Sequence, residues 1–233
     1  MNREISIMIQ LQRFWDGVLL ARDEIARAGK SIDFWKKQVA DTEKSLALLE
    51  SRIKTMKSAI KQKEIELSQK DEKSTKLEAR KTAVKNEREL AALESEKHTL
   101  DGERTALEEK VLMEMEELDG ASAEEKRLSG ELDGMKVQAE KDILMLQGRI
   151  AENRKAMEEN QAAYDALLVE LTPPFRAKFH KLTESAGGKA IVRLDGETCE
   201  GCRFQIPLNF VLDAAKSDRV VNCTHCGRFI YKP

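Results

Sequence analysis

The stretch "DTEKSLALLESRIKTMKSAI", residues 41–60, decides the fold of most of this chain. Its apolar residues recur in alternating steps of three and four, which places them on one stripe of an α-helix. A stripe that is held over many turns is typical of a coiled coil. The same stepping extends in both directions, with some polar positions, through Val39, Thr42, Leu46, Leu49, Ile53, Met56, Ile60, Lys63, Leu67, Lys70, Ser74 and Leu77.

A second apolar seam runs from Leu93 to Leu171 with the same alternation of steps. All four prolines lie at Pro173 or later, so the residues before them lack the strongest helix breaker. The two seams therefore predict long, uninterrupted helices over nearly three quarters of the chain.

Between the two seams, the apolar pattern lapses from Leu77 to Leu90. Asn86 lies in this lapse, and Asn is a favoured residue at the N-cap of a helix. We therefore expect a mostly α fold in which residues 1–172 form a long antiparallel coiled-coil hairpin with its turn at about 80–87. One unbroken helix over the same residues is the alternative.

The distribution of charge supports a hairpin and predicts its register. Residues 108–125 hold eight acidic residues and one basic residue, Lys110. A turn near 84–85 would bring this acidic segment opposite about 45–62, which contains Arg52, Lys54, Lys57 and Lys61. Opposed charges beside an apolar seam select the partner and the register more than they add stability.

Composition narrows the classes of function. The net charge of −2 implies no global attraction to nucleic acid or to an anionic membrane. The sequence has none of the roughly 18-residue apolar runs that predict a membrane span, and its start does not resemble a signal peptide. It also shows no nucleophile–base constellation and no phosphate loop. We therefore expect a cytoplasmic protein that is not an enzyme, binds no small-molecule substrate and contacts no membrane.

The chain changes character after the second seam. Thr172 is placed to cap a short linker helix over 173–188, with Pro173 at its first position and Gly187–Gly188 at its end. Short segments with strand composition follow, "KAIVRL" and "RVVN". We expect residues 189–233 to form a small separate β domain.

All four cysteines lie in this last part, as Cys199-x2-Cys202 and Cys223-x2-Cys226, and twenty residues separate the two pairs. This is zinc-site spacing, because each pair on a tight turn presents two sulfurs to one ion. Two disulfides would need an oxidising compartment, and a redox pair would be expected beside a βαβ pattern. We expect one structural Zn²⁺, with His225 as a spacer. A closed shell of four thiolates argues against zinc catalysis.

Two functions remain open from these residues. The hairpin offers long faces to a protein partner, and Trp15 and Trp35 either fill its open end or anchor such a partner. Alternatively, the cysteine-rich domain binds nucleic acid. Basic and aromatic residues alternate there, and the candidate contacts are Arg203, Arg228 and Lys232. The neighbouring aromatic residues also fit a small hydrophobic core.

The segments "CEGCRFQIP" with Asn209, "VVNCTHCGRFIY" and "VKNERELAALESE" resemble a bacterial family of C4-type zinc-ribbon proteins with a long N-terminal coiled-coil hairpin. The resemblance covers essentially the whole chain. It implies that the four cysteines bind zinc in a non-enzymatic, cytoplasmic protein. It also implies partners of the kinds linked to some members, which are flagellar or type III secretion components, the alternative sigma factor sigma-54, and RNA.

Overall fold

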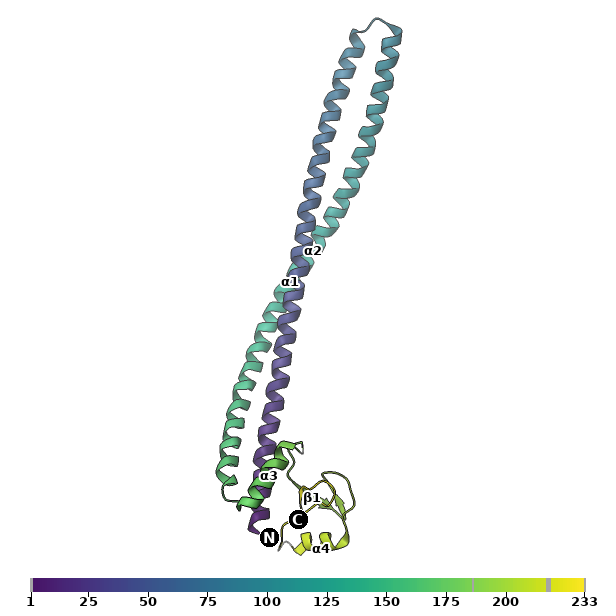
Figure 1. Cartoon of the computed structure of the whole chain (residues 1–233). Coiled ribbons are helices and arrows are strands. Elements are labelled where there is room, and N and C mark those ends of the chain that lie inside the picture. The colour runs from purple at the N-terminus through teal and green to yellow at the C-terminus, as the bar shows by residue number, and fades with distance from the viewer. Residues whose placement is uncertain (1, 186, 217–218, 233) are drawn as a thin grey trace. The chain divides into compact units, whose positions relative to one another are not determined.

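The computed structural model describes residues 2–185, 187–216 and 219–232 (Figure 1). Its elements are α1 (Arg3–Ala83), α2 (Glu87–Leu168), α3 (Pro173–Ser185), β1 (Ile191–Asp195), β2 (Thr198–Cys199), α4 (Leu208–Lys216), β3 (Val221–Asn222) and β4 (Phe229–Tyr231). Two long helices followed by a small strand region confirm the predicted mostly α fold.

The chain divides into two compact units, and α1 and α2 contribute to both. We call residues 34–141 the hairpin unit, and residues 1–33 with 142–233 the ribbon unit. The predicted borders at 172 and 188 both fall inside the ribbon unit.

In the hairpin unit, α1 and α2 run antiparallel and are joined by ion pairs across the seam. Lys70 Nζ lies 2.6 Å from Glu103, and Arg104 Nη1 lies 3.2 Å from Asp71. The polar residues that interrupt the seam therefore have partners on the facing helix. The buried apolar residues of this unit are Ile53, Ile60, Leu77, Val111, Leu132 and Ala139. The hairpin unit is therefore held by a thin apolar seam together with paired charges.

The turn between α1 and α2 lies at residues 84–86, within the range predicted for it. Asn86 caps α2, because its side-chain oxygen accepts a hydrogen bond from the amide of Arg88 at 3.1 Å. Its carbonyl accepts the amide of Leu90 at 2.9 Å. The local signal for the second helix, an N-cap residue ahead of an apolar seam, therefore produced the expected structure.

The predicted register is wrong by several residues. In the predicted register, Glu114 of the acidic segment would lie opposite about residue 56, but it pairs with Lys63 at 2.6 Å. The direction of helical side chains explains part of this shift. Each side chain leans toward the N-terminus of its own helix, so in an antiparallel pair it covers a spot about one position back from its own Cα. A side chain therefore contacts a residue of the facing helix that has a higher number than the residue whose Cα lies directly opposite.

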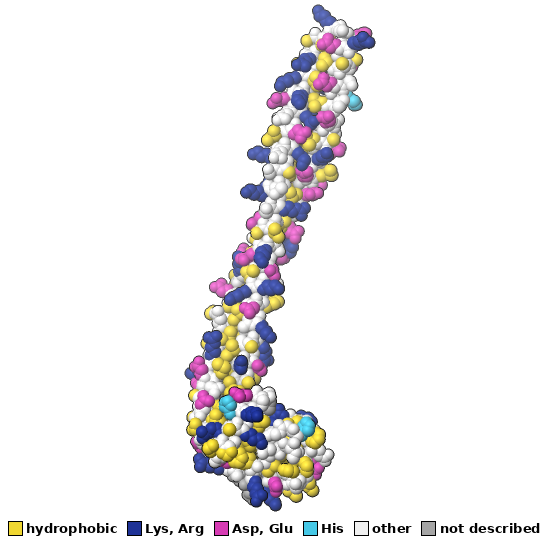
Figure 2. Space-filling model, in the orientation of Figure 1, with side chains coloured by type: hydrophobic (Ala, Val, Ile, Leu, Met, Phe, Trp, Pro, Cys, Tyr) yellow, Lys and Arg dark blue, Asp and Glu magenta, His cyan; other side chains and the backbone are white. Residues whose placement is uncertain are grey.

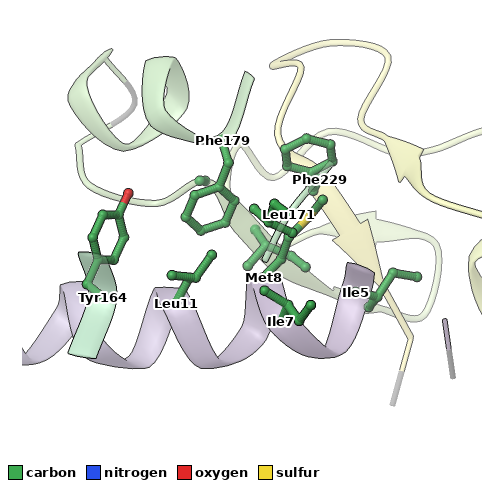
Figure 3. Packing of buried hydrophobic residues seen from close by; sticks show 10 residues of the cluster. Ile5, Ile7, Met8, Leu11, Tyr164, Leu171, Phe179 and Phe229 are labelled. Atoms are coloured by element: carbon green, nitrogen blue, oxygen red, sulfur yellow. The ribbon is translucent and has the colours of Figure 1, made fainter. Parts of the chain in front are cut away.

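The main core lies in the ribbon unit and draws on α1, α2, α3 and the sheet (Figure 3). Phe179 of α3 is fully buried, and its ring lies 6.5 Å from that of Tyr164 and 6.3 Å from that of Phe229. Met8 and Leu11 of α1 are also fully buried in this cluster. Trp15 packs beside it, with its ring 5.2 Å from that of Tyr164. One core therefore joins the start of α1 to the strands that follow α3.

The four strands form one sheet in the order β2-β1-β4-β3. Strand β1 pairs parallel with β4, with Ile191 opposite Phe229, and antiparallel with β2. Strand β3 pairs antiparallel with β4. The segment predicted as the first strand overlaps β1, and the second contains β3, whereas α4 was not predicted. Across the described part of the chain, every helix is too short or too polar to cross a lipid bilayer.

Candidate metal centre

Each cysteine pair lies on a tight turn that is closed by a backbone hydrogen bond. In the first turn, Arg203 donates its amide to the carbonyl of Cys199 at 2.7 Å. In the second, Gly227 donates its amide to the carbonyl of Cys223 at 3.0 Å. Arg203 and Gly227 hold equivalent places and both have positive φ, 61° and 72°. The left-handed residue of the first turn is therefore Arg203 rather than a glycine.

The two turns bring the four sulfurs together. All four Sγ atoms lie within 4.8 Å of one another, with 4.0 Å between Cys199 and Cys226 and 3.7 Å between Cys202 and Cys223. A tetrahedral zinc ion with Zn–S bonds of about 2.3 Å requires sulfur separations of about 3.8 Å. Disulfide sulfurs lie about 2.05 Å apart, so these separations suit a metal site and not a disulfide.

The surroundings of the cysteines suit a structural ion. Cys199 and Cys223 are buried, and the four cysteines pack with a second apolar cluster: Val192, Leu194, Ile206, Val211, Ala214, Val221 and Ile230. The strands are only two to five residues long. Small domains of this kind draw much of their folding free energy from metal binding, so we expect the strands to depend on the metal.

The thiols differ in acidity. Burial raises the pKa of the Cys199 thiol to about 12. Burial also acts to raise the pKa of Cys226, but hydrogen bonds from the backbone and guanidinium of Arg228 lower it to about 7. Zinc binds thiolates, so it must displace protons from the less acidic cysteines, and binding weakens as the pH falls. The lowered pKa of Cys226 therefore makes its thiol easier to ionise than that of Cys199 before metal binds.

His225 lies between two of the cysteines but takes another role. Its ring stacks on that of Phe204, with centroids 4.3 Å apart and an angle of 8° between the planes. Among the described residues, the group placed to hold a metal consists of the four cysteines. His225 thus contributes an aromatic stack beside the cysteine cluster.

Two of the three candidate nucleic-acid contacts line different clefts. Arg228 lines a cleft of about 500 Å³ with Gln12 and Tyr231, whereas Arg203 lines a separate groove with Phe204. Lys232 is exposed near the end of the described residues. The guanidinium of Arg228 is engaged by backbone carbonyls, which makes it part of the fold around the cysteines.

Residues far from the cysteines position the ribbon, and the sequence pattern did not single them out. Gln12 of α1 is buried, and its amide nitrogen donates to the carbonyl of Gly188 at 2.7 Å. Its amide oxygen accepts the amide of Ala190 at 2.8 Å. Lys189 also pairs with Asp16 of α1 at 2.8 Å. A polar residue in an apolar stripe, such as Gln12 between Met8 and Trp15, is the signal that was available.

Comparison with known proteins supports this assignment. A family model described as C4-type zinc ribbon domain matches residues 198–230. The C-terminal segment is a four-cysteine zinc ribbon. Its cofactor is one structural zinc ion, as predicted, and Cys199, Cys202, Cys223 and Cys226 are positioned to bind it.

Among curated proteins, the chain is 25% identical over 131 residues to the uncharacterized proteins MT2288 and Rv2229c of two Mycobacterium tuberculosis strains. The match covers 55% of this chain and 53% of each relative, so the chain spans about half the length of the curated relatives it matches.

Two solved structures share the fold over nearly the full length. CT398 from Chlamydia trachomatis matches with a TM-score of 0.86 and 18% identity, covering 100% of both chains. HP0958 from Helicobacter pylori matches with a TM-score of 0.65 and 16% identity, covering 99% of this chain and 98% of its own. These similarities establish the fold and leave the activity to be inferred from the surface.

Proposed function

We propose that this chain is a non-enzymatic cytoplasmic adaptor that binds a protein partner through its helical hairpin, with the zinc ribbon as a structural module. The observation that carries the proposal is a group of exposed apolar side chains on α2, inside the acidic segment. Leu112 is 62% exposed, and Met113 and Met115 are also exposed. Large apolar side chains grouped on a surface indicate an interaction site more often than scattered ones do.

The helical spacing places two of these residues on one face with acidic neighbours. Leu112 and Met115 are three residues apart, and Glu108 and Glu116 lie four residues on either side of Leu112. Residues at these spacings are neighbours on a helix surface. The face therefore combines an apolar centre with a negative border.

Most of the acidic residues in this segment are not neutralised by the hairpin itself. Three of its eight acidic residues form ion pairs: Glu108 with Arg104, Glu114 with Lys63 and Glu124 with Arg127. Among the described residues, no ion pair is formed by the other five, which are Glu109, Glu116, Glu117, Asp119 and Glu125. Figure 2 shows charges of both signs along the long helices. In the sequence, residues 108–125 hold eight acidic residues and one basic residue. A partner helix with apolar residues on one side and basic residues at its edges would complement this surface.

The family resemblance suggests where to look for such a partner. The candidates are sigma-54 and components of flagellar or type III secretion systems, which are linked to some members of the family. Trp15 is not an anchor in this proposal, because it packs beside the core of the ribbon unit. Phe34 of the hairpin unit is exposed and contacts the ring of Trp35, so it offers a second apolar group.

Affinity capture from the native cell with matched variants tests the proposal. The test variant is Leu112→Gln with Met115→Gln. The control is Leu48→Gln with Ile65→Gln, which removes exposed apolar side chains from α1, where Leu48 is 74% exposed. We expect the test variant to lose about 90% of the captured partner, because central apolar residues dominate binding energy, and the control to retain it. Equal capture by both variants would contradict the proposal.

A nucleic-acid role is the second candidate, and one observation favours it. Phe204 is 51% exposed, stacks on His225 and lies next to Arg203. An exposed aromatic stack beside a guanidinium suits a nucleobase next to a phosphate. If this function holds, Phe204→Ala with Arg203→Ala weakens binding to single-stranded RNA and flattens its salt dependence. RNA binding that is unaffected by this variant would contradict the candidate.

A further inference from the structure

Arg228 connects the two cysteine turns through a single side chain. It follows the second turn, and its carbonyl accepts the amide of Cys223 at 2.8 Å. Its guanidinium then reaches the first turn, where Nη1 donates to the carbonyl of Gly201 at 3.1 Å. Because Gly201 lies between Cys199 and Cys202, one arginine holds backbone groups of both turns.

The same side chain is anchored at a third point. Arg228 Nε donates to the carbonyl of Lys189 at 2.8 Å, just ahead of β1. Lys189 in turn pairs with Asp16 of α1. The guanidinium is planar and its donors are fixed in direction, so bonds to two separate carbonyls restrict where both can lie.

Gly201 makes room for this arginine. A Cβ at this position would lie 2.8 Å from Cδ of Arg228 and 3.2 Å from its Nη1. Gly201 is not among the glycines with positive φ, so conformational freedom does not explain it. Its place in the turn is explained by the close approach of Arg228, which packs over the bare backbone.

A four-thiolate zinc centre is also stabilised by a positive group beside it. Four thiolates around Zn²⁺ carry a net charge of −2, and burying such a charge is costly unless a positive group lies nearby. The guanidinium of Arg228 lies beside the cysteines, because its Nη1 donates to the carbonyl of Gly201, between Cys199 and Cys202. The nearby Lys189 is engaged with Asp16, so it does not take this role.

We propose that Arg228 is the positioning residue of the zinc centre. It holds the two cysteine turns at the spacing that zinc requires, and it offsets the negative charge of the four thiolates. This role is independent of the proposed adaptor function, because it concerns only how the ribbon retains its metal. It also accounts for Gly201 as the residue that admits the arginine.

The rate of zinc release tests the proposal on the full-length, zinc-loaded protein. Excess chelator with a chromogenic zinc reporter gives the rate for the wild type, Arg228→Gln and Arg228→Lys. Lys232→Gln is the matched control, because it removes a nearby exposed positive charge. Loss of a residue that supports metal ligands lowers metal affinity by about 10–100-fold. We expect release about 10-fold faster or more in Arg228→Gln, a smaller increase in Arg228→Lys, and the wild-type rate in Lys232→Gln.

Gly201→Ala provides an independent test that keeps the arginine. The added methyl group should displace Arg228 and accelerate zinc release, and combining it with Arg228→Gln should add little to either change. The helical thermal transition should stay unchanged in these variants, which separates a local effect on zinc from general unfolding. Wild-type release rates in both Arg228→Gln and Gly201→Ala would overturn the proposal, and a wild-type rate in Arg228→Lys alone would overturn the bridging role.

Discussion

The ribbon unit and the hairpin unit are built from the same two long helices but are stabilised in different ways. The ribbon unit combines a core of large apolar side chains, a metal centre and the buried amide of Gln12. The hairpin unit has a thin seam and ion pairs that are largely exposed, and exposed pairs contribute only about 0–1 kcal/mol each. The hairpin unit therefore rests on a repeating helical pattern, whereas the ribbon unit depends on particular contacts among α1, α3, the strands and the metal site.

Loss of the metal should affect the two units most unequally. We expect Cys223→Ser to abolish stoichiometric zinc binding, because three thiolates cannot complete the closed structural site. The ribbon sheet should unfold, while the helical circular dichroism signal of the long helices largely persists. Metal analysis of the purified protein together with circular dichroism checks this. A variant that retains one zinc per chain would show that the four-cysteine assignment is wrong.

The shared core should be the next most sensitive feature. Phe179 is fully buried among Tyr164, Phe229 and Met8, so Phe179→Ala should reduce the free energy of unfolding of the ribbon unit by about 3–5 kcal/mol. Ala47→Gly, on an exposed helical position of the hairpin unit, serves as a mild comparison at about 1 kcal/mol. Denaturant titration measures both. Equal losses of unfolding free energy in the two variants would contradict a larger contribution of the buried core in the ribbon unit.

The buried amide of Gln12 gives a sharper test of the contact between α1 and β1. Gln12→Leu puts an apolar side chain of similar size in this position, but it leaves the carbonyl of Gly188 and the amide of Ala190 without their partner. Unsatisfied buried groups of this kind cost about 1–3 kcal/mol each. We expect a loss of stability near 2–3 kcal/mol in the ribbon unit. A neutral or stabilising effect would indicate that this contact is not formed in solution.

The sequence predicts the features that depend on local patterns better than those that depend on contacts between distant residues. The apolar steps, the late prolines and Asn86 are local signals, so they predicted two long helices and the place of the turn. The cysteine spacing predicted the zinc site because a metal imposes a recognisable pattern. The register was missed in part because it depends on side-chain direction. The roles of Gln12 and Arg228 were missed because both bind carbonyls of residues that are far away in sequence.

Glycines should respond in opposite directions in the two units. In the hairpin unit, nothing lies within 4 Å of a Cβ added at Gly134, so Gly134→Ala should stabilise the helix by about 1 kcal/mol. In the ribbon unit, a Cβ at Gly188 would lie 2.3 Å from Leu19 Cδ1, and its φ is +82°, so Gly188→Ala should destabilise. Thermal unfolding measures both signs. Destabilisation by Gly134→Ala would imply a contact at that position.

The smallest expected effect is a pH dependence confined to the hairpin unit. Hydrogen bonding and charge attraction from Lys70 lower the pKa of Glu103 from its usual value of 4.5. Because its pKa is lower in the folded state, this carboxylate adds stability above about pH 4.5 and loses that contribution as the pH falls through the lowered pKa. Glu103→Gln should flatten the acid dependence of amide exchange around residues 66–74, and an unchanged dependence would contradict this.

Amide hydrogen exchange of the intact protein, zinc-loaded and after chelation, distinguishes the two units residue by residue. We expect metal removal to increase exchange in the ribbon strands and in their core partners, α3 and the first turns of α1. Residues 34–141 should exchange at the same rates in both states. Increased exchange spread evenly over both units, or no increase in α3, would contradict a metal-dependent ribbon that shares its core with the start of α1.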